Sequence, residues 1–312
     1  MKNSAIAVSG LRKAYGDRAV LDGIGFEVPA GTVFSLLGPN GAGKTTTVNI
    51  LATLLTADAG TVRVAGHDVA AGTRQVRAAI GVTGQFAAVD ELLSGRENLR
   101  LMADLKRVPA ADRLVAGLLE RFDLVEAADD RASAYSGGMR RKLDLAMTLV
   151  GDPRIIFLDE PTTGLDPRSR RTMWGIVREL VAAGTTIFLT TQYLEEADQL
   201  ADRIAVLDRG RLVAEGTPEE LKRRVPGTHV RLRFAGLDEL DAAARLLAGS
   251  ARDDQELTLR VASDGESRSL RALLDRLDEN TINAQEFSVH RPDLDDVFLA
   301  LTGRPSVEAV AK

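Results

Sequence analysis

Apolar positions along the chain follow two different periods, and segments of the two kinds alternate over most of its length. Short continuous apolar runs, such as Val33–Leu37, predict strands that are buried on both faces of a parallel sheet. Similar runs occupy residues 154–158 and 185–189. Stretches with apolar positions three or four residues apart, such as 46–54 and 168–182, predict helices. This alternation indicates an α/β fold with a mostly parallel sheet.

Three segments depart from this alternation. Residues 4–8 and 19–28 predict strands of an antiparallel edge region. Residues 96–106, 110–122 and 138–150 have helical periodicity with little strand signal, which predicts a helical insert at about residues 88–150. Beyond a linker at residues 222–228, strand and helix patterns predict a small α+β domain. We therefore expect a domain at 1–224, an accessory domain at 225–303 and a tail at 304–312.

Composition narrows the class of protein. The chain has 312 residues, of which 45% are hydrophobic and 27% charged, and it contains no cysteine. Because it has no apolar run near the roughly 18–20 residues of a membrane span and no signal-like N-terminus, we expect a cytosolic protein. Residues 225–312 carry the whole net charge of −5. Since neither part is strongly basic, we expect no nucleic-acid partner.

The first candidate for chemistry is the segment Gly38-Pro39-Asn40-Gly41-Ala42-Gly43-Lys44-Thr45, which matches G-x-x-x-x-G-K-[ST] between a strand and a helix. Small residues let backbone N–H groups surround a triphosphate, and the helix N-terminus adds its positive dipole end. Lys44 supplies a charge for the β- and γ-phosphates, while the Thr45 hydroxyl can hold Mg²⁺. The alternative is a glycine-rich turn that binds nothing.

A second candidate anion site begins the last helix of the insert. Ser136 suits an N-cap, and Gly137 and Gly138 allow a ligand to approach the backbone closely. An ordinary helix cap is the alternative. Two consecutive glycines argue against it, because each weakens a helix start by about 1 kcal/mol relative to alanine.

Two adjacent carboxylates follow the predicted strand at residues 154–158. Because neighbouring side chains there face different directions, Asp159 can hold Mg²⁺ while Glu160 orients or deprotonates a water molecule. Asp166 is expected to cap a helix that begins at Pro167.

Each of two further residues has a functional and a purely structural interpretation. Tyr15, expected in the turn between the first two strands, can stack on a base or simply pack on the surface. Gln85 follows a predicted strand and can reach Mg²⁺ or water, or be an exposed polar residue.

Taken in order, these motifs resemble the nucleotide-binding subunit of an ATP-binding cassette (ABC) transporter over residues 4–222. The segments that carry the resemblance are GPNGAGKTT (Gly38–Thr46, Walker A), YSGGM (Tyr135–Met139, signature), IIFLDEP (Ile155–Pro161, Walker B), GLDP (Gly164–Pro167, D-loop), Gln85 (Q-loop) and Tyr15 (adenine-stacking aromatic). Ser-Gly-Gly opening a helix just before Walker B is close to diagnostic.

The resemblance implies a P-loop NTPase core that binds ATP and Mg²⁺ and hydrolyses ATP. It places nucleotide contacts on Tyr15, Gly38, Pro39, Asn40, Gly41, Ala42, Gly43, Lys44, Thr45, Thr46, Gln85, Ser136, Gly137, Gly138 and Asp166, metal contacts on Thr45, Gln85 and Asp159, and catalysis on Glu160 and Gln192. It also implies a head-to-tail homodimer in the ATP-bound state, in which Ser136 of one subunit completes the site of the other.

The sequence departs from the family pattern at two positions. Met139 stands where the signature usually has glutamine, and Gln192 stands where the switch residue is usually histidine. The three histidines, at positions 67, 229 and 290, lie elsewhere. Glutamine can donate a hydrogen bond to a γ-phosphate oxygen but carries no charge, so a mechanism with a protonated switch residue is not expected.

Residues 82–99, 190–210 and 294–303 resemble a narrower group, the ATPase subunits of daunorubicin/doxorubicin-resistance exporters. This resemblance implies a subunit on the cytoplasmic face of the membrane that powers drug efflux through a separate transmembrane permease. The alternatives are export of a lipid or polysaccharide, and a soluble ABC ATPase outside transport. The last is disfavoured, because the chain has a single phosphate loop, no sustained heptads and no basic tract.

Overall fold

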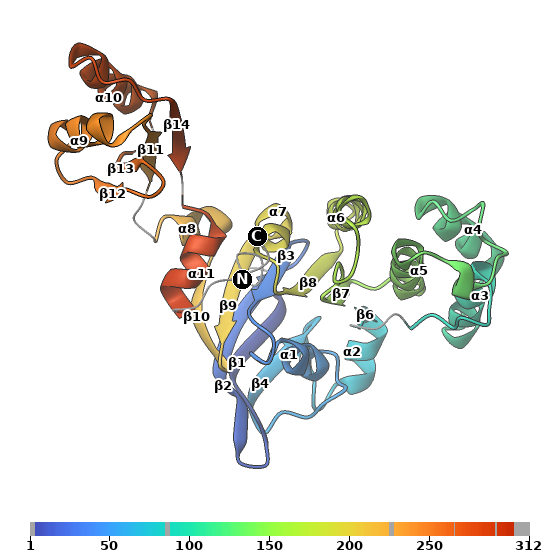
Figure 1. Ribbon diagram of the computed structural model, residues 1–312. Helices are drawn as coiled ribbons and strands as arrows, with labels where there is room; N and C mark the ends of the chain where they lie inside the picture. The colour runs from blue at the N-terminus through green and yellow to red at the C-terminus, as the bar shows by residue number, and fades with distance from the viewer. Residues whose placement is uncertain (1–3, 85–87, 225–227, 265, 291, 303–312) are drawn as a thin grey trace. The chain divides into compact units, whose positions relative to one another are not determined.

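The computed structural model describes residues 4–84, 88–224, 228–264, 266–290 and 292–302. They form two compact units (Figure 1). The first comprises the described residues up to Pro218 together with Leu301 and Thr302, and the second comprises Glu219–Ala300. Among the described residues the first unit contains two sheets and the second contains one, and each unit has its own hydrophobic core.

A six-stranded sheet forms the centre of the first unit. Its strand order is β10 (Arg211–Gly216), β9 (Arg203–Asp208), β3 (Val33–Leu37), β8 (Thr186–Thr191), β7 (Ile155–Asp159) and β6 (Ile80–Thr83). The strands are parallel except β10, which is antiparallel to β9. Every residue of β3, β7 and β8 is buried, which explains their continuous apolar runs. The predicted α/β core with a mostly parallel sheet is confirmed.

An antiparallel sheet lies against this core. Its order is β2 (Arg18–Pro29), β1 (Ser4–Tyr15), β4 (Ala59–Val64) and β5 (His67–Asp68). Phe26 from β2 stacks on Phe34 of β3 with ring centroids 5.1 Å apart, and Phe188 of β8 packs on both rings. Strand β1 continues past the predicted residue 8, because β-bulges let its pairing with β2 extend to the hairpin turn.

Helices complete the first unit. They are α1 (Lys44–Leu51), α2 (Thr73–Ala79), α3 (Gly95–Leu105), α4 (Ala111–Arg121), α5 (Gly137–Leu149), α6 (Pro167–Ala182) and α7 (Leu194–Leu200), with a short 3₁₀ turn at Ala132–Ala134. The three predicted helices of the insert are α3, α4 and α5, which lie together in Figure 1. The sequence interpretation missed α2, whose seven residues are too few to establish a helical period.

The second unit is built on an antiparallel sheet of order β12 (Ala251–Asp253), β13 (Thr258–Ala262), β11 (His229–Arg233) and β14 (Glu286–His290). Its helices include α9 (Leu237–Leu246) and α10 (Ser267–Glu279), which enclose a core around Val230, Leu232 and Leu259. Short helices α8 (Pro218–Lys222) and α11 (Leu294–Thr302) occur near its ends. Fully antiparallel pairing confirms the predicted α+β class; the three-residue β12 was not predicted.

Candidate functional site

The glycine-rich loop leads from the buried strand β3 directly into helix α1. Gly41 and Gly43 have φ values of 79° and 114°, which favour glycine. A Cβ atom at Gly43 would lie 2.7 Å from Leu21 Cδ2 and 3.0 Å from the Val20 carbonyl oxygen of strand β2. The loop therefore passes too close to a neighbouring strand for a side chain, and its backbone can approach a ligand instead.

Lys44 begins helix α1 and is only 4% exposed. Its ammonium donates hydrogen bonds to the carbonyl oxygens of Gly38 at 2.8 Å and Pro39 at 3.2 Å. It also forms an ion pair with Glu160, with Nζ 3.1 Å from Oε1. The phosphate loop and the Walker B carboxylate are thus joined through one buried cation, as expected of two parts of one site.

A cavity of about 320 Å³ opens at this point. The residues that line it are Arg18, Val20, Asn40, Gly41, Gly43, Lys44, Thr45, Thr46 and Glu160. It brings six of the predicted nucleotide contacts together with the predicted base. Lys44 and the N-terminus of α1 supply its positive charge, which suits a polyphosphate.

The two carboxylates lie at the carboxyl end of β7, and the adjacent strand β8 holds both. Thr190 donates its hydroxyl to Asp159 Oδ1, and its carbonyl oxygen accepts the Glu160 N–H at 3.0 Å. Glu160 has a positive φ of 50°, a conformation that costs of order 1–3 kcal/mol for a residue other than glycine. Such strain at a carboxylate facing a phosphate loop is typical of a catalytic position.

Gln192 follows β8 and points at the same carboxylate. Its Nε2 donates to Glu160 Oε2 at 3.4 Å, and the Thr163 hydroxyl donates to the same oxygen at 3.3 Å. Gln192 Oε1 is buried without a hydrogen-bond partner among the described residues. The predicted switch residue therefore lies beside the predicted base, joined to it by hydrogen bonding alone.

The second candidate anion site lies elsewhere in the unit. Ser136 caps α5, its hydroxyl accepting the Met139 N–H at 3.2 Å, and both Ser136 and Gly137 are exposed. A Cβ atom at Gly138 would lie 2.7 Å from Ser169 Oγ. None of residues 136–138 lines the cavity beside Lys44, so the two predicted anion sites are separate within one chain.

Asp166 is the N-cap of α6, as predicted. Its Oδ1 accepts the N–H groups of Arg168 and Ser169, and its Oδ2 accepts the Ser169 hydroxyl at 2.6 Å. These bonds, that of the Ser169 hydroxyl first, hold the pKa of the Asp166 carboxyl below its ordinary value. Ser169, which donates its hydroxyl to Asp166, also lies close to Gly138 at the start of α5. Asp166 does not line the cavity beside Lys44.

Tyr15 is not in the turn, as the sequence interpretation placed it, but is the last residue of β1 and pairs with Arg18. Tyr15 is 53% exposed, and the Lys13 ammonium lies 5.7 Å from the centroid of the Tyr15 ring. Its strand partner Arg18 lines the cavity, whereas Tyr15 itself does not. Gln85 lies outside the described residues.

Sequence reasoning missed Arg18, Val20 and Thr190. The first two reach the cavity from the antiparallel sheet, and no local pattern signals that approach. Thr190 immediately precedes Thr191 and Gln192 at the end of a predicted strand, and this position next to Gln192 could have marked it as a site residue.

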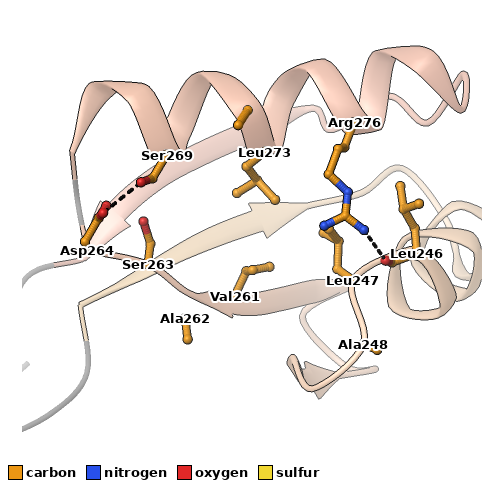
Figure 2. A pocket seen from close by; sticks show the side chains of 11 residues that line it. Leu246, Leu247, Ala248, Val261, Ala262, Ser263, Asp264, Ser269, Leu273 and Arg276 are labelled. Atoms are coloured by element: carbon orange, nitrogen blue, oxygen red, sulfur yellow. Dashed lines mark hydrogen bonds between the residues drawn. The ribbon is translucent and has the colours of Figure 1, made fainter.

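The second unit contains a larger cavity, of about 680 Å³, between α9, β13 and α10 (Figure 2). Its polar groups are engaged with one another: Arg276 Nη2 donates to the Leu246 carbonyl oxygen at 3.0 Å and the Ser269 hydroxyl donates to Asp264 Oδ2 at 2.8 Å. Its other lining residues are mostly apolar. The larger volume of this cavity therefore does not by itself favour it as a nucleotide site over the smaller cavity beside Lys44.

The donor set fits a nucleotide with a hard divalent cation. Within the described ranges, no cluster of three or more His, Cys, Asp or Glu side chains is placed to hold a metal. Mg²⁺ is usually held by one or two protein oxygens together with substrate phosphates and water, and Thr45 and Asp159 offer such oxygens. No helix in the part of the chain that the structure describes has the length and apolar character needed to span a membrane.

A P-loop, a strained Walker B glutamate and a capped Ser-Gly-Gly helix on one mixed α/β core define an ATP-binding cassette, a class of ATPase. The chain belongs to the ABC transporter family. The family model described as "ABC transporter" matches residues 21–163. Residues 216–302 match "ATP-binding protein DrrA1-3-like, C-terminal domain". The chain is therefore an ATP-binding cassette protein that binds and hydrolyses ATP.

Relatives match along nearly the whole chain. The daunorubicin/doxorubicin resistance ATP-binding protein DrrA of Streptomyces peucetius is 50% identical, over 97% of this chain and 93% of its own. Daunorubicin resistance ATP-binding protein DrrA3 of Streptomyces coeruleorubidus is 49% identical, over 97% of each chain. The Nod factor export ATP-binding protein I of Ralstonia nicotianae is 40% identical, over 96% and 94%.

Solved structures agree on the fold. The ATP-binding subunit of an ABC transporter superposes with a TM-score of 0.64 at 29% identity, covering 70% of this chain and 92% of the other. An ABC transporter cassette in its ADP conformation gives the same TM-score at 26% identity, over 70% and 92%.

Proposed function

We propose that this chain is the ATP-hydrolysing subunit of an exporter that moves a hydrophobic drug out of the cell through a separate membrane permease. The observation that carries the proposal is 50% identity, over almost the full length, to a daunorubicin/doxorubicin resistance ATP-binding protein. The subunit would act at the cytoplasmic face of the membrane, attached through the permease.

At the site, Lys44 and the loop from Gly38 to Thr46 would hold the triphosphate of ATP. Mg²⁺ would be held by Thr45 and Asp159, with Gln85 as a further ligand, and it would offset charge on the phosphates. Glu160 would act as the base that takes a proton from the attacking water. Gln192, whose amide group already reaches Glu160, would hydrogen-bond a γ-phosphate oxygen.

Hydrolysis would take place in a head-to-tail homodimer. Ser136 and Gly137, at the start of α5, are exposed, and neither they nor Gly138 line the chain's own cavity, which supports a separate anion site there. A second copy in opposite orientation would bring this site, with Asp166 beside it, over the triphosphate. Tyr15 would stack on the adenine ring. Closing the gap between two copies would pull on two membrane subunits and so link hydrolysis to transport.

A different cargo is the second candidate. The 40% identity to a Nod factor export protein, again over nearly the full length, supports it. Both candidates require the same ATPase chemistry and differ only in what the permease carries.

The test uses inverted membrane vesicles in which this chain is co-expressed with a candidate transmembrane permease. We expect ATP-dependent uptake of daunorubicin, followed by its fluorescence, and loss of both uptake and ATPase activity in Lys44→Ala, which lacks the phosphate-binding charge. Arg100→Ala, which removes an exposed cation in α3, is the control. ATPase activity without daunorubicin uptake would favour the other cargo, and normal turnover in Lys44→Ala would refute the site.

A further inference from the structure

Helix α5 carries a buried ion pair that lies outside the cavity beside Lys44. Arg141 Nη1 is 3.2 Å from Asp144 Oδ2, and the two side chains are 8% and 3% exposed. Burial lowers the pKa of the Arg141 guanidinium and raises that of the Asp144 carboxyl. Removing two charges from water is costly, and further hydrogen bonds to the two side chains are needed to offset this cost.

The guanidinium of Arg141 contacts the backbone on both sides of Glu160. Its Nε donates to the Pro161 carbonyl oxygen at 2.9 Å, and its Nη2 donates to the Asp159 carbonyl oxygen at 3.3 Å. The N–H of the same Asp159–Glu160 peptide is held by Thr190. Arg141 and Thr190 thus hold the strained backbone conformation of Glu160 from opposite ends of one peptide.

The ion pair also contacts the chain on both sides of Gln85. Arg141 Nη1 donates to the Gly84 carbonyl oxygen at 2.8 Å, and Asp144 Oδ1 accepts the Ala88 N–H at 3.0 Å. One guanidinium therefore serves three separate carbonyl groups as well as a carboxylate. Its planar array of five donors suits this task, and a lysine ammonium cannot reproduce it.

We propose that Arg141, supported by Asp144, is a positioning residue for ATP hydrolysis: it aligns the backbone around Glu160 and beside Gln85 with helix α5. The proposal rests on the proposed role of Glu160 as the base. Helix α5 begins at Gly137, immediately after Ser136, so the helix proposed to contact the ATP of a second subunit also holds the base of its own.

Arg141→Lys tests this in steady-state ATPase assays of the full chain. We expect kcat to fall by at least about tenfold, since small displacements of a catalytic group have effects of this size or larger. The KM for ATP and the affinity for a fluorescent ATP analogue should change less than about threefold, because Lys44 and its loop are untouched. Arg100→Lys, the same change at an exposed position in α3, should behave as wild type.

The double variant Arg141→Gln/Asp144→Asn separates positioning from stability. It removes both buried charges and so leaves neither charge unpaired, so its loss of thermal stability should be smaller than that of Arg141→Gln alone. Glutamine cannot span the three carbonyl groups, so kcat should stay low; this variant decides the question if Arg141→Lys does not fold. Wild-type kcat in either folded variant would overturn the inference, whereas an inactive wild-type chain would instead contradict the proposed function.

Discussion

Glu160→Gln is the change with the most distinct expected outcome. It keeps the shape of the side chain and an oxygen for the Lys44 ammonium, but removes the negative charge 3.1 Å from Nζ. Breaking a buried ion pair by removing one partner costs about 3–5 kcal/mol in unfolding free energy. Lys44 retains the Gly38 and Pro39 carbonyl oxygens, so we expect a smaller loss, of about 1–3 kcal/mol without nucleotide.

Mg-ATP should reverse this loss. In the wild type, Glu160 competes with phosphate for the Lys44 ammonium, and in Glu160→Gln that competition is weaker. The variant should therefore bind ATP at least as tightly as the wild type and gain more thermal stability from it. Turnover should fall by a factor of about 10²–10⁴, the usual contribution of a general base, which corresponds to about 3–5 kcal/mol of activation free energy.

Three measurements check these expectations: light scattering with Mg-ATP reports dimer formation, phosphate release reports turnover, and thermal unfolding reports stability with and without nucleotide. Glu160→Gln should accumulate as an ATP-bound dimer. Glu195→Gln, the same change at a largely exposed carboxylate, should match the wild type in all three. A Glu160→Gln protein that remains monomeric at every concentration, or that turns over like the wild type, would refute the reasoning.

Three further outcomes are expected. Gln192→Ala should lose most ATPase activity while Gln192→His retains it, and the wild-type pH profile should have no limb near pH 6.5 from a switch histidine; normal hydrolysis by Gln192→Ala would exclude a switch role. A chain shortened to end at Arg224 should still bind a fluorescent ATP analogue, since the residues that line the cavity lie between Arg18 and Glu160; a folded but non-binding product would contradict this. Burial raises the pKa of the Glu196 carboxyl above its ordinary value of 4.5. Protonation of this carboxyl in the folded protein therefore stabilises the fold below pH 4.5, and this stabilisation is lost as the pH rises through the folded-state pKa. Glu196→Gln should therefore raise Tm at pH 8 and show a shrinking advantage as pH falls toward 4.5; a pH-independent difference would contradict the assignment.

Local patterns predicted most of the site. The glycine loop, the Asp159-Glu160 pair and the Ser136 cap each depend on neighbouring residues whose conformations are set by a strand end or a helix start. Tyr15 was misplaced because β-bulges, which leave no clear mark in the apolar pattern, extend strand β1 to the hairpin turn. Helix α2 and strand β12 are shorter than the window over which a period becomes visible.

By itself, the sequence determined the class of fold and the order of the motifs, and it predicted the residues that would meet a triphosphate, because strand burial and loop chemistry follow local periodicity and residue type. Only the tertiary structure decided which distant segments meet. Crossover connections place β7 and β8 side by side and so put Glu160 within reach of Gln192 and Lys44. The same packing brings Arg141 against three separate carbonyl groups, because contacts between residues far apart in the chain depend on how the elements stack.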